Sequence, residues 1–348
     1  MALQASGPIS FLQISGEFGL PSNKNIGAYR VSQTVGELSN LPLDNNIPQS
    51  GAIRFSDFYS KKLNVVMNFG NGSRINARTS YDNNSIGIIS VIGGYRIRPT
   101  SSSGTKVWIY VSGTITSNSA SGQLYCSLLT GNWDNNTDLR LDIGPSGFVL
   151  GVGGSGGIGG AIGGGRGGDG TPGTSAIGVT YQPITIVNRG TILPGTGGGG
   201  GGGGGRRGLE PTDTRPDTRI YVGGGGGGGG RPFGLGGGVT IGDGTDPTRE
   251  PGRSAGLFNN GPGGVGGFAS RTGDEGNLNK LNGGNGGTGG SGGGDAYTNN
   301  AAPNAIIGSG GSPGATGFAF VISTNGSAVT IDPGTGISGG IIYNTSPI

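Results

Sequence analysis

Between residues 63 and 150 the chain alternates short apolar runs with polar turn clusters rich in Asn, Gly and Ser. Runs this short are typical of β-strands, whereas an amphipathic helix needs a longer stretch with apolar residues three and four apart. The spacing predicts a β-sandwich or jelly-roll-like domain over residues 63–150. Its strands are expected at 63–69, 86–92, 106–111, 124–129 and 139–143.

Residues 1–62 carry few apolar positions, and the clearest of these lie near the two ends of the segment. A domain of about 60 residues buries a small share of its surface and is marginally stable alone. The segment therefore predicts either a small irregular cap or a docking module that completes its core against another protein. Under the docking interpretation the contact residues are Ile9, Phe11, Ile53, Phe55, Phe58 and Tyr59.

Glycine dominates the chain from residue 151 onward, and it accounts for 86 of the 348 residues. Two runs consist of glycine alone, at 197–205 and 223–230. Other segments repeat Gly-Gly-X triplets, most regularly over 283–294. Because glycine has no side chain to bury, residues 151–317 cannot form a conventional apolar core.

A period of three residues matches the polyproline II helix, in which every third residue lies on the same edge. A Gly-Gly-X repeat leaves two edges of such a helix bare, and a pure glycine run leaves all three bare. The helix has no internal hydrogen bonds, so its N–H and C=O groups must be paired by neighbours. We therefore predict a polyglycine II bundle over residues 151–317, with the pure glycine runs inside and the Gly-Gly-X segments outside.

A flexible linker is the alternative interpretation, since ordering a glycine costs about 0.5–1 kcal/mol more than ordering an alanine. Two features favour the bundle. The triplet register persists throughout 283–294, and the intervening segments carry apolar groups such as those at 220–222. Residues 318–348 would close the domain with further strands. The predicted fold class is thus all-β with a polyglycine II bundle and little or no α-helix.

The chain has no histidine and a single cysteine, Cys126. This composition excludes a Ser-His-Asp triad, an imidazole metal site, an intrachain disulfide and a thiolate cluster. We expect no cofactor and no metal, and we expect Cys126 to be a small buried apolar residue. With 22 basic and 19 acidic residues the charge is nearly balanced, which argues against nucleic acid binding. The first residues lack the features of a signal peptide, and no apolar stretch is long enough to span a membrane.

Two motifs resemble signatures of nucleotide binding or catalysis. Residues 151–156 fit G-x-G-x-x-G, but glycine-rich sequence follows where a dinucleotide site needs a helix. Asp213 and Asp217 could form the carboxylate pair of a glycosidase. Arginines such as Arg215 lie close to them in the sequence, so solvated loop charges are the favoured interpretation and an enzyme is not expected.

If the bundle is rigid, the segments that join its helices emerge at its two ends, and loops on a rigid scaffold are common binding sites. These segments are rich in arginine, which forms bidentate contacts with carboxylate and phosphate, and they contain aromatic rings that can stack on a ligand. Packing of the bundle ends is the alternative role of these rings. The candidate recognition residues are Arg206, Arg207, Arg215, Arg219, Tyr221, Arg249, Arg253 and Phe258.

The alternation of glycine motifs and other segments over 151–317 resembles the tip adhesins of T-even-type bacteriophages. In these adhesins a polyglycine II sandwich holds receptor-binding loops at the end of a tail fibre. The segments 8–11 and 50–59 resemble the short leader of tail and baseplate proteins of marine and cyanobacterial phages. The resemblance implies that residues 1–62 attach to another virion protein. Residues 63–150 do not match the T-even adhesins, which leaves a fibre tip and a baseplate both open.

We therefore expect a non-enzymatic receptor-binding adhesin of the virion tail, assembled in the host cytoplasm. Its partners would be other tail or baseplate proteins, through residues 1–62, and a host cell-surface receptor that is either a protein or a glycan. Nucleic acid binding and membrane insertion are not expected, and a homo-oligomer stays open. The alternatives are a purely structural spacer of the tail or baseplate and a polysaccharide-degrading tail enzyme.

Overall fold

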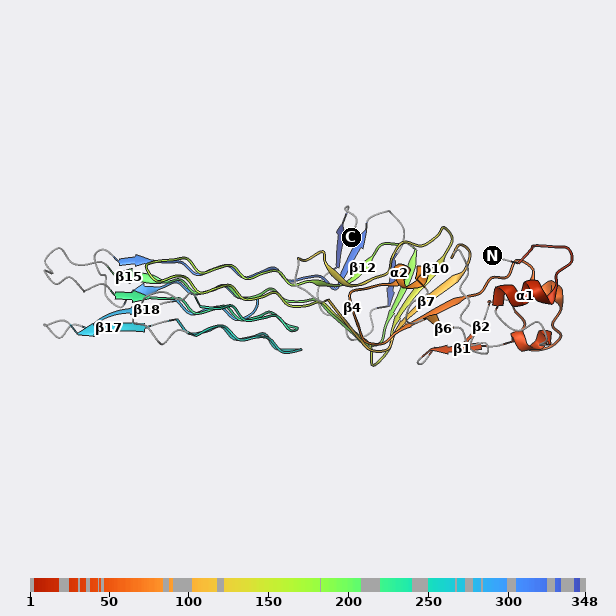
Figure 1. The fold of residues 1–348 in the computed structure, drawn as a ribbon, viewed down its shortest axis with the longest axis horizontal. Helices are drawn as coiled ribbons and strands as arrows, with labels where there is room; N and C mark the ends of the chain where they lie inside the picture. The colour runs from red at the N-terminus through yellow and green to blue at the C-terminus, as the bar shows by residue number, and fades with distance from the viewer. Residues whose placement is uncertain are drawn as a thin grey trace.

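The computed structural model is elongated, with three parts that follow one another along its longest axis (Figure 1). A small N-terminal module lies at one end, a stack of strands lies in the middle, and long glycine-rich segments extend to the other end. The structure describes residues 3–18, 25–30, 32–35, 38–42, 44, 47–83, 88–89, 102–117, 122–181, 183–207, 220–239, 250–266, 268–272, 278–282, 284–298, 305–323, 329–332 and 341–344.

The N-terminal module has a small apolar core of its own. Three aromatic rings meet edge to face at its centre, with centroids 5.5 Å apart for Tyr29–Phe58 and 6.1 Å apart for Phe18–Phe58. The buried carboxylate of Glu17 accepts a hydrogen bond from the backbone N–H of Leu63 (3.0 Å), where the chain leaves the module. The elements of the module are helix α1 (Phe11–Phe18), the 3-10 helices η1 (Ile26–Tyr29) and η2 (Phe55–Phe58), and the hairpin of β1 (Ser32–Val35) and β2 (Leu38–Pro42).

The middle part is a solenoid in which each complete turn of the chain adds one strand to each of three parallel sheets. Strand β6 (Ile88–Ile89) pairs antiparallel with the first strand, and helix α2 (Ala77–Asp82) follows the first turn. The first turn is β3 (Val65–Phe69), β4 (Gly72–Ser73) and β5 (Ile75–Asn76), and the second is β7 (Lys106–Val111), β8 (Thr114–Thr116) and β9 (Cys126–Leu129). The third turn is β10 (Asp138–Ile143), β11 (Phe148–Leu150) and β12 (Ser175–Val179), and the fourth is β13 (Ile184–Asn188), β14 (Thr191–Leu193) and β21 (Phe320–Ser323). The last strands are β22 (Val329–Asp332) and β23 (Ile341–Asn344).

Apolar side chains from all three sheets fill the interior of the solenoid. Ile109, Ile115 and Leu128 come from one turn, one from each sheet, and all three are fully buried. Along a sheet the buried positions stack, because Ile109 lies in register with Leu141 and Leu141 with Ile186. This stacked core is what stabilises the middle part.

The expected all-β class with little helix is confirmed, but the strands of residues 63–150 do not form a β-sandwich. Neighbouring strands are parallel, and each pairs with a strand one turn away. An alternating pattern shows which side chains face inward, and it carries no information on which strand is the partner. Strands β12 to β14 and β21 to β23 join the same sheets, so these sheets extend past the division expected at residue 150.

The first glycine segments continue the hydrogen-bond ladder of the solenoid without a break. Strands β11 and β14 are sheet neighbours, and the segments that follow them stay paired with a constant offset along the chain. The backbone N–H groups of one segment donate to carbonyls of the other in the pairs Gly151 to Leu193, Gly154 to Thr196, Gly157 to Gly199 and Gly160 to Gly202. The register of the solenoid therefore sets the register of the glycine segments.

We call the extended glycine-rich segments rods and number them in chain order. Backbone hydrogen bonds between neighbouring rods arrange them in three layers, which contain rods 2, 1 and 5, then rods 10, 3, 4 and 6, then rods 9, 8 and 7. Their bounds are rod 1 (151–161), rod 2 (165–174), rod 3 (195–205), rod 4 (223–230), rod 5 (234–239), rod 6 (250–256), rod 7 (260–266), rod 8 (284–289), rod 9 (291–296) and rod 10 (308–317).

Rod 3 shows how a pure glycine run is held. Successive N–H groups donate to three different rods: Gly199 to rod 4, Gly200 to rod 9 and Gly201 to rod 2, at 2.8–2.9 Å. The carbonyls of Gly199, Gly200 and Gly201 accept from rods 1, 8 and 10 in turn. The glycines at 197–204 and 223–230 are all buried, whereas Ile158 and Leu235 of the outer layer are 57% and 65% exposed. The predicted polyglycine II bundle is therefore confirmed, with the pure glycine runs inside.

Side chains replace the missing neighbours of rods at the edge of the bundle. The carboxylate of Asp169 accepts from the N–H of Ser312 (2.7 Å) and pairs with Arg166 (2.7 Å). The carboxylate of Asp295 in rod 9 accepts from the N–H of Gly310 (2.7 Å), which lies in rod 10 together with Ser312. These bonds satisfy backbone donors that have no further rod beside them.

Replacing Gly200 by alanine should disrupt the bundle. A Cβ atom there would lie less than 3.0 Å from the Gly311 backbone, which cannot move without breaking its own bonds. We expect the free energy of unfolding to fall by at least about 3 kcal/mol, the upper end of the usual cost of overpacking. Gly238→Ala is the matched control, because nothing lies within 4 Å of its added Cβ. Equal losses for both variants in thermal or denaturant unfolding would contradict the packing argument.

Acid should break the hydrogen bond that the Ser312 N–H of rod 10 donates to Asp169. The bonds that rod 10 makes to the interior of the bundle should remain. The Ser312 N–H and the Arg166 ion pair lower the pKa of Asp169 from its ordinary 3.8. A pKa lowered by folding means that this stabilisation is complete above about pH 3.8 and is lost as pH falls through the lower folded value. Amide exchange measured from about pH 5 to about pH 2, corrected for intrinsic rates, should show protection lost at Ser312 and kept at Gly311, which bonds to Gly201. Asp169→Asn should abolish this pH dependence, and its persistence would rule out Asp169 as the cause.

Candidate functional site

The end of the bundle farthest from the N-terminal module carries two small antiparallel sheets (Figure 1). Strand β16 of the first sheet contacts both β17 and β18 of the second, so the two sheets adjoin. We call this region the distal end. Its strands are β15 (Gly205–Arg207), β16 (Ile220–Val222) and β20 (Ala305–Ile307), and β17 (Phe268–Thr272), β18 (Leu278–Asn282) and β19 (Tyr297–Thr298).

The rods place these strands next to one another although they are far apart in the sequence. Strand β15 continues rod 3, β16 leads into rod 4, and β20 leads into rod 10. The turn between rods 1 and 2 lies at the same end, where Gly163 and Gly164 adopt left-handed φ angles of 96° and 99°. A side chain at these positions would strain the turn, so glycine is what lets the chain reverse here.

Three of the candidate recognition residues come together at the distal end. Arg206 lies in register with Tyr221 on one side and with Ile306 on the other, and Arg207 follows in the same strand. Arg253 lies instead on rod 6, and Phe258 lies in the turn between rods 6 and 7 at the opposite end of the bundle. Arg215, Arg219 and Arg249 lie outside the described residues.

Sequence reasoning left exposed apolar residues of the distal end out of the candidate set. Tyr297 is 55% exposed, and Ile306 and Ile307 are each 45% exposed. Large apolar side chains in contact with water at one end of a scaffold are typical of an interaction surface. A signal was present, since all three residues lie in the non-glycine segment between rods 9 and 10, but the candidate residues all came from positions 206–258.

The predicted docking residues divide between the surface and the core of the N-terminal module. Phe58 is fully buried, and Tyr59 donates a hydrogen bond to the Gly7 carbonyl (2.5 Å). Phe11 and Phe55 form an edge-to-face pair near the surface, with centroids 4.8 Å apart and Phe55 37% exposed. Ile9 and Ile53 pack against the edge of the core and are partly buried. The sequence analysis missed Leu12, which is 73% exposed on α1.

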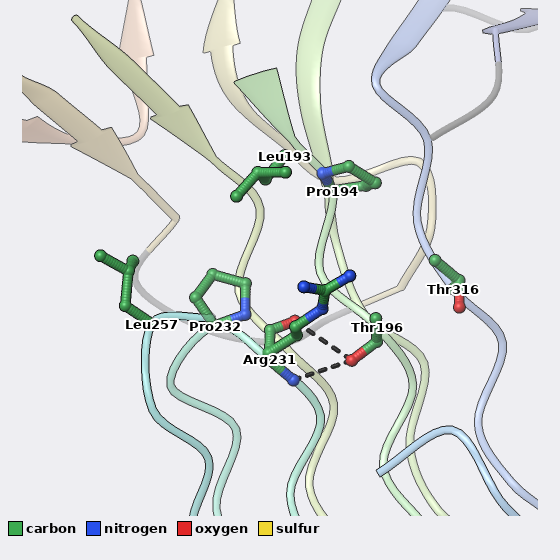
Figure 2. A pocket seen from close by; sticks show the side chains of 7 residues that line it. All are labelled: Leu193, Pro194, Thr196, Arg231, Pro232, Leu257 and Thr316. Atoms are coloured by element: carbon green, nitrogen blue, oxygen red, sulfur yellow. Dashed lines mark hydrogen bonds between the residues drawn. The ribbon is translucent and has the colours of Figure 1, made fainter. Parts of the chain in front are cut away.

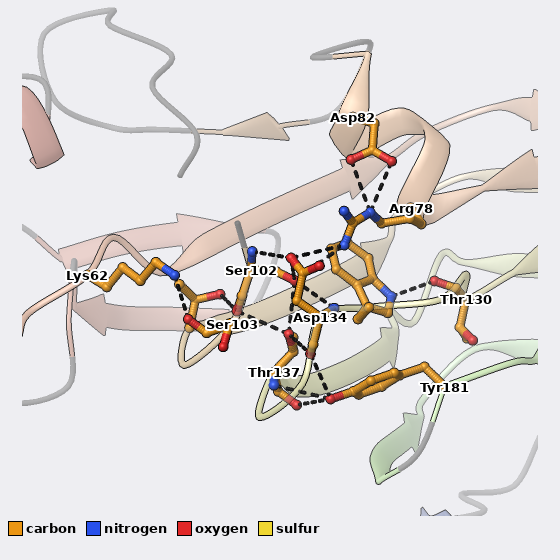
Figure 3. A network of polar contacts seen from close by, with 11 residues as sticks. Lys62, Arg78, Asp82, Ser102, Ser103, Thr130, Asp134, Thr137 and Tyr181 are labelled. Atoms are coloured by element: carbon orange, nitrogen blue, oxygen red, sulfur yellow. Dashed lines mark hydrogen bonds and ion pairs between the residues drawn. The ribbon is translucent and has the colours of Figure 1, made fainter. Parts of the chain in front are cut away.

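A group of polar residues in the solenoid forms a connected network of contacts (Figure 3). The carboxylate of Asp134 accepts from the N–H and hydroxyl of Ser102 (2.7 and 2.8 Å) and pairs with Arg78 (3.3 Å). Burial acts to lower the pKa of Arg78, but hydrogen bonds and charges from Asp82 and Asp134 outweigh it and raise the pKa. The hydroxyl of Tyr181 joins the network through backbone carbonyls. These contacts hold polar groups in fixed pairs and join α2 to two loops of the solenoid.

Cys126 is 3% exposed, as expected for a small buried residue. Burial raises the pKa of its thiol to about 12, against a smaller opposing effect of Arg74, so the thiol stays protonated at neutral pH. Within the described part of the chain, no group of three or more Asp, Glu, His or Cys side chains could hold a metal ion. None of the described helices is long and apolar enough to cross a membrane.

The fold and the distal end define a hydrogen-bonded scaffold that presents separate chain segments at one end. A sequence model of the phage tail fibre adhesin Gp38 family matches residues 74–342, which is well over half of the chain. The chain therefore belongs to this family of phage tail fibre adhesins, and the family places it in the tail of the virion.

The structure is also similar to one in the crystal structure of the gp37–gp38 adhesin tip complex of the bacteriophage S16 long tail fibre. The TM-score is 0.45 and the sequence identity is 20%, over 97% of this chain and 100% of that one. Curated proteins gave no match to the chain.

Proposed function

We propose that the chain binds a host cell-surface receptor through its distal end and that it does so without catalysis. The rods hold six strands from three separate segments in fixed relative positions, which lowers the ordering cost of binding. The observation that carries the proposal is the arrangement of Arg206, Tyr221 and Ile306 on adjacent strands at the end of a rigid bundle. Arginine and tyrosine are among the residues that dominate binding energy at protein interfaces.

The N-terminal module, residues 1–62, is proposed to attach the chain to another tail or baseplate protein. It lies at the opposite end of the molecule from the distal end (Figure 1). Its surface carries Leu12 and the Phe11–Phe55 pair in contact with water. An apolar surface at one end and a recognition surface at the other suit a protein that joins a fibre to a cell.

Arg206→Ala/Arg207→Ala and Tyr221→Ala phages should adsorb to host cells at least about tenfold more slowly, because a lost interface anchor costs about 2 kcal/mol or more. Arg189→Ala, an exposed arginine of the solenoid, is the matched control and should adsorb normally. Adsorption assays on virions with equal protein content would decide. Normal adsorption of both distal variants would mean that the receptor is bound outside the distal end. Normal adsorption of phage that lacks the protein would mean that the protein is a structural spacer.

Leu12→Asp and Phe55→Asp should abolish incorporation of the protein into virions, because a charge at an apolar contact is left without water or a partner. Both side chains are exposed in the isolated chain, so the module should still fold. Leu124→Asp supplies the control, since Leu124 is 44% exposed on the solenoid. Quantifying the protein in purified virions tests the idea, and normal incorporation of both module variants would refute it.

A further inference from the structure

A pocket of about 110 Å³ lies where the solenoid meets the bundle, and we call it the collar pocket (Figure 2). Its apolar walls are Leu193 and Pro194 at the end of β14, Pro232 in the turn between rods 4 and 5, and Leu257 in the turn between rods 6 and 7. A cavity of about 150 Å³ in another protein accommodates benzene. The collar pocket therefore has room for one compact apolar group.

Hydrogen bonds hold two other residues that line the pocket, Thr196 and Arg231, in place. The backbone N–H of Arg231 donates to the hydroxyl of Thr196 (2.8 Å) and to the side-chain oxygen of Asn260 (3.0 Å). The side-chain amide of Asn260 donates in turn to the Gly289 carbonyl (2.7 Å), which ties the turn to rod 8. This side of the pocket is therefore ordered before a ligand arrives.

Two exposed aromatic residues are next in the sequence to residues that line the pocket. Phe233 follows the wall residue Pro232 and is 49% exposed, and Phe258 follows Leu257 and is 53% exposed. Phe233 also adopts a left-handed φ of 61°, a strained conformation for a bulky residue. Exposed rings and strain of this kind are concentrated at binding sites.

The pocket carries one positive charge. The guanidinium of Arg231 lines it and donates to the Phe258 carbonyl (3.1 Å). Among the described residues, no carboxylate lies within ion-pair distance of Arg231. A guanidinium beside an apolar pocket is complementary to a ligand that combines an apolar group with a carboxylate.

We propose that the collar pocket is a second attachment point, which binds an apolar side chain and a neighbouring carboxylate of a host surface protein. The pocket lies where the solenoid meets the bundle. The solenoid separates this junction from the N-terminal module, which is proposed to face the virion (Figure 1). A rod of nine residues spans about 28 Å at the rise of this helix. An adhesin bound at its distal end thus holds the collar pocket roughly that far from the receptor contact, within reach of a tall surface protein.

The lining favours a protein segment over a sugar. A sugar ring needs many hydrogen-bonding partners, and the pocket offers mainly Leu and Pro walls. An apolar anchor that fills a pocket beside an arginine is, in contrast, the usual composition of a protein interface centre.

N-acetyl-L-leucine is a probe that carries both groups, and it should bind the full-length protein. The methyl resonances of Leu193 and Leu257 should shift and saturate on titration. N-acetyl-L-leucinamide lacks the carboxylate and N-acetylglycine lacks the apolar side chain, and each should bind at least about tenfold more weakly. Arg231→Gln keeps a donor for the Phe258 carbonyl and removes the charge. The variant should therefore bind N-acetyl-L-leucine only as weakly as the unaltered protein binds the amide. Three results would each overturn the proposed ligand chemistry. They are a failure of N-acetyl-L-leucine to saturate the protein, equal binding of N-acetyl-L-leucine and its amide, and equal binding of N-acetyl-L-leucine by Arg231→Gln and by the unaltered protein.

Phages that carry Arg231→Gln with Leu257→Ala test the source of the ligand. We expect slower adsorption by at least about tenfold with normal incorporation of the protein into virions. Lost incorporation would assign the pocket to a virion partner, and normal adsorption with normal incorporation would remove the attachment role. The distal variants at Arg206 and Arg207 should bind N-acetyl-L-leucine normally, so a failure of the collar proposal is separable from a failure of the proposed receptor site.

Discussion

The hydrogen bond between the backbone N–H of one rod and the carbonyl of the next is the interaction on which this molecule depends. A single bond of this kind contributes about 0.5–1.5 kcal/mol net. The apolar core of the described residues lies in the solenoid and the N-terminal module, so the bundle depends on the sum of its backbone bonds. Such bonds form only when rods approach closely, and an added Cβ would meet neighbouring backbone at less than 3.0 Å at most interior glycines. The glycine content of the chain follows directly from this geometry.

The bundle is inserted into the solenoid rather than attached after it. Rods 1 and 2 separate β11 from β12, and rods 3 to 10 separate β14 from β21. The strands on both sides of each insertion are held in sheets with buried apolar residues such as Ile177 and Phe320. The solenoid therefore supplies both the starting register and the anchorage that a bundle without apolar side chains lacks.

The sequence predicted the bundle because a three-residue period has a direct geometric meaning, and it placed the pure glycine runs inside for the same reason. It could not predict the solenoid, since the strand pattern of residues 63–150 does not show that Ile109 pairs with Leu141 and Met67 in parallel. It could not separate the buried Phe58 from the exposed Phe55, which occupy similar positions in the pattern. It also grouped Phe258 with Arg206, although the two residues lie at opposite ends of the bundle. The end at which a loop lies depends on the direction of the rod before it, and that direction depends on how many rods precede it.

The shared ladder of strands and rods has a mechanical consequence. A pull on the distal end acts along the rods, and the bonds between rods 1 and 3 run across that direction from Gly151 to Gly202. Bonds loaded in shear must yield together, whereas bonds at the end of a hairpin can be peeled apart one at a time. If the distal end binds the host cell as proposed, tension between that cell and the fibre is spread over the bonds between rods 1 and 3 and passed into the sheets of the solenoid.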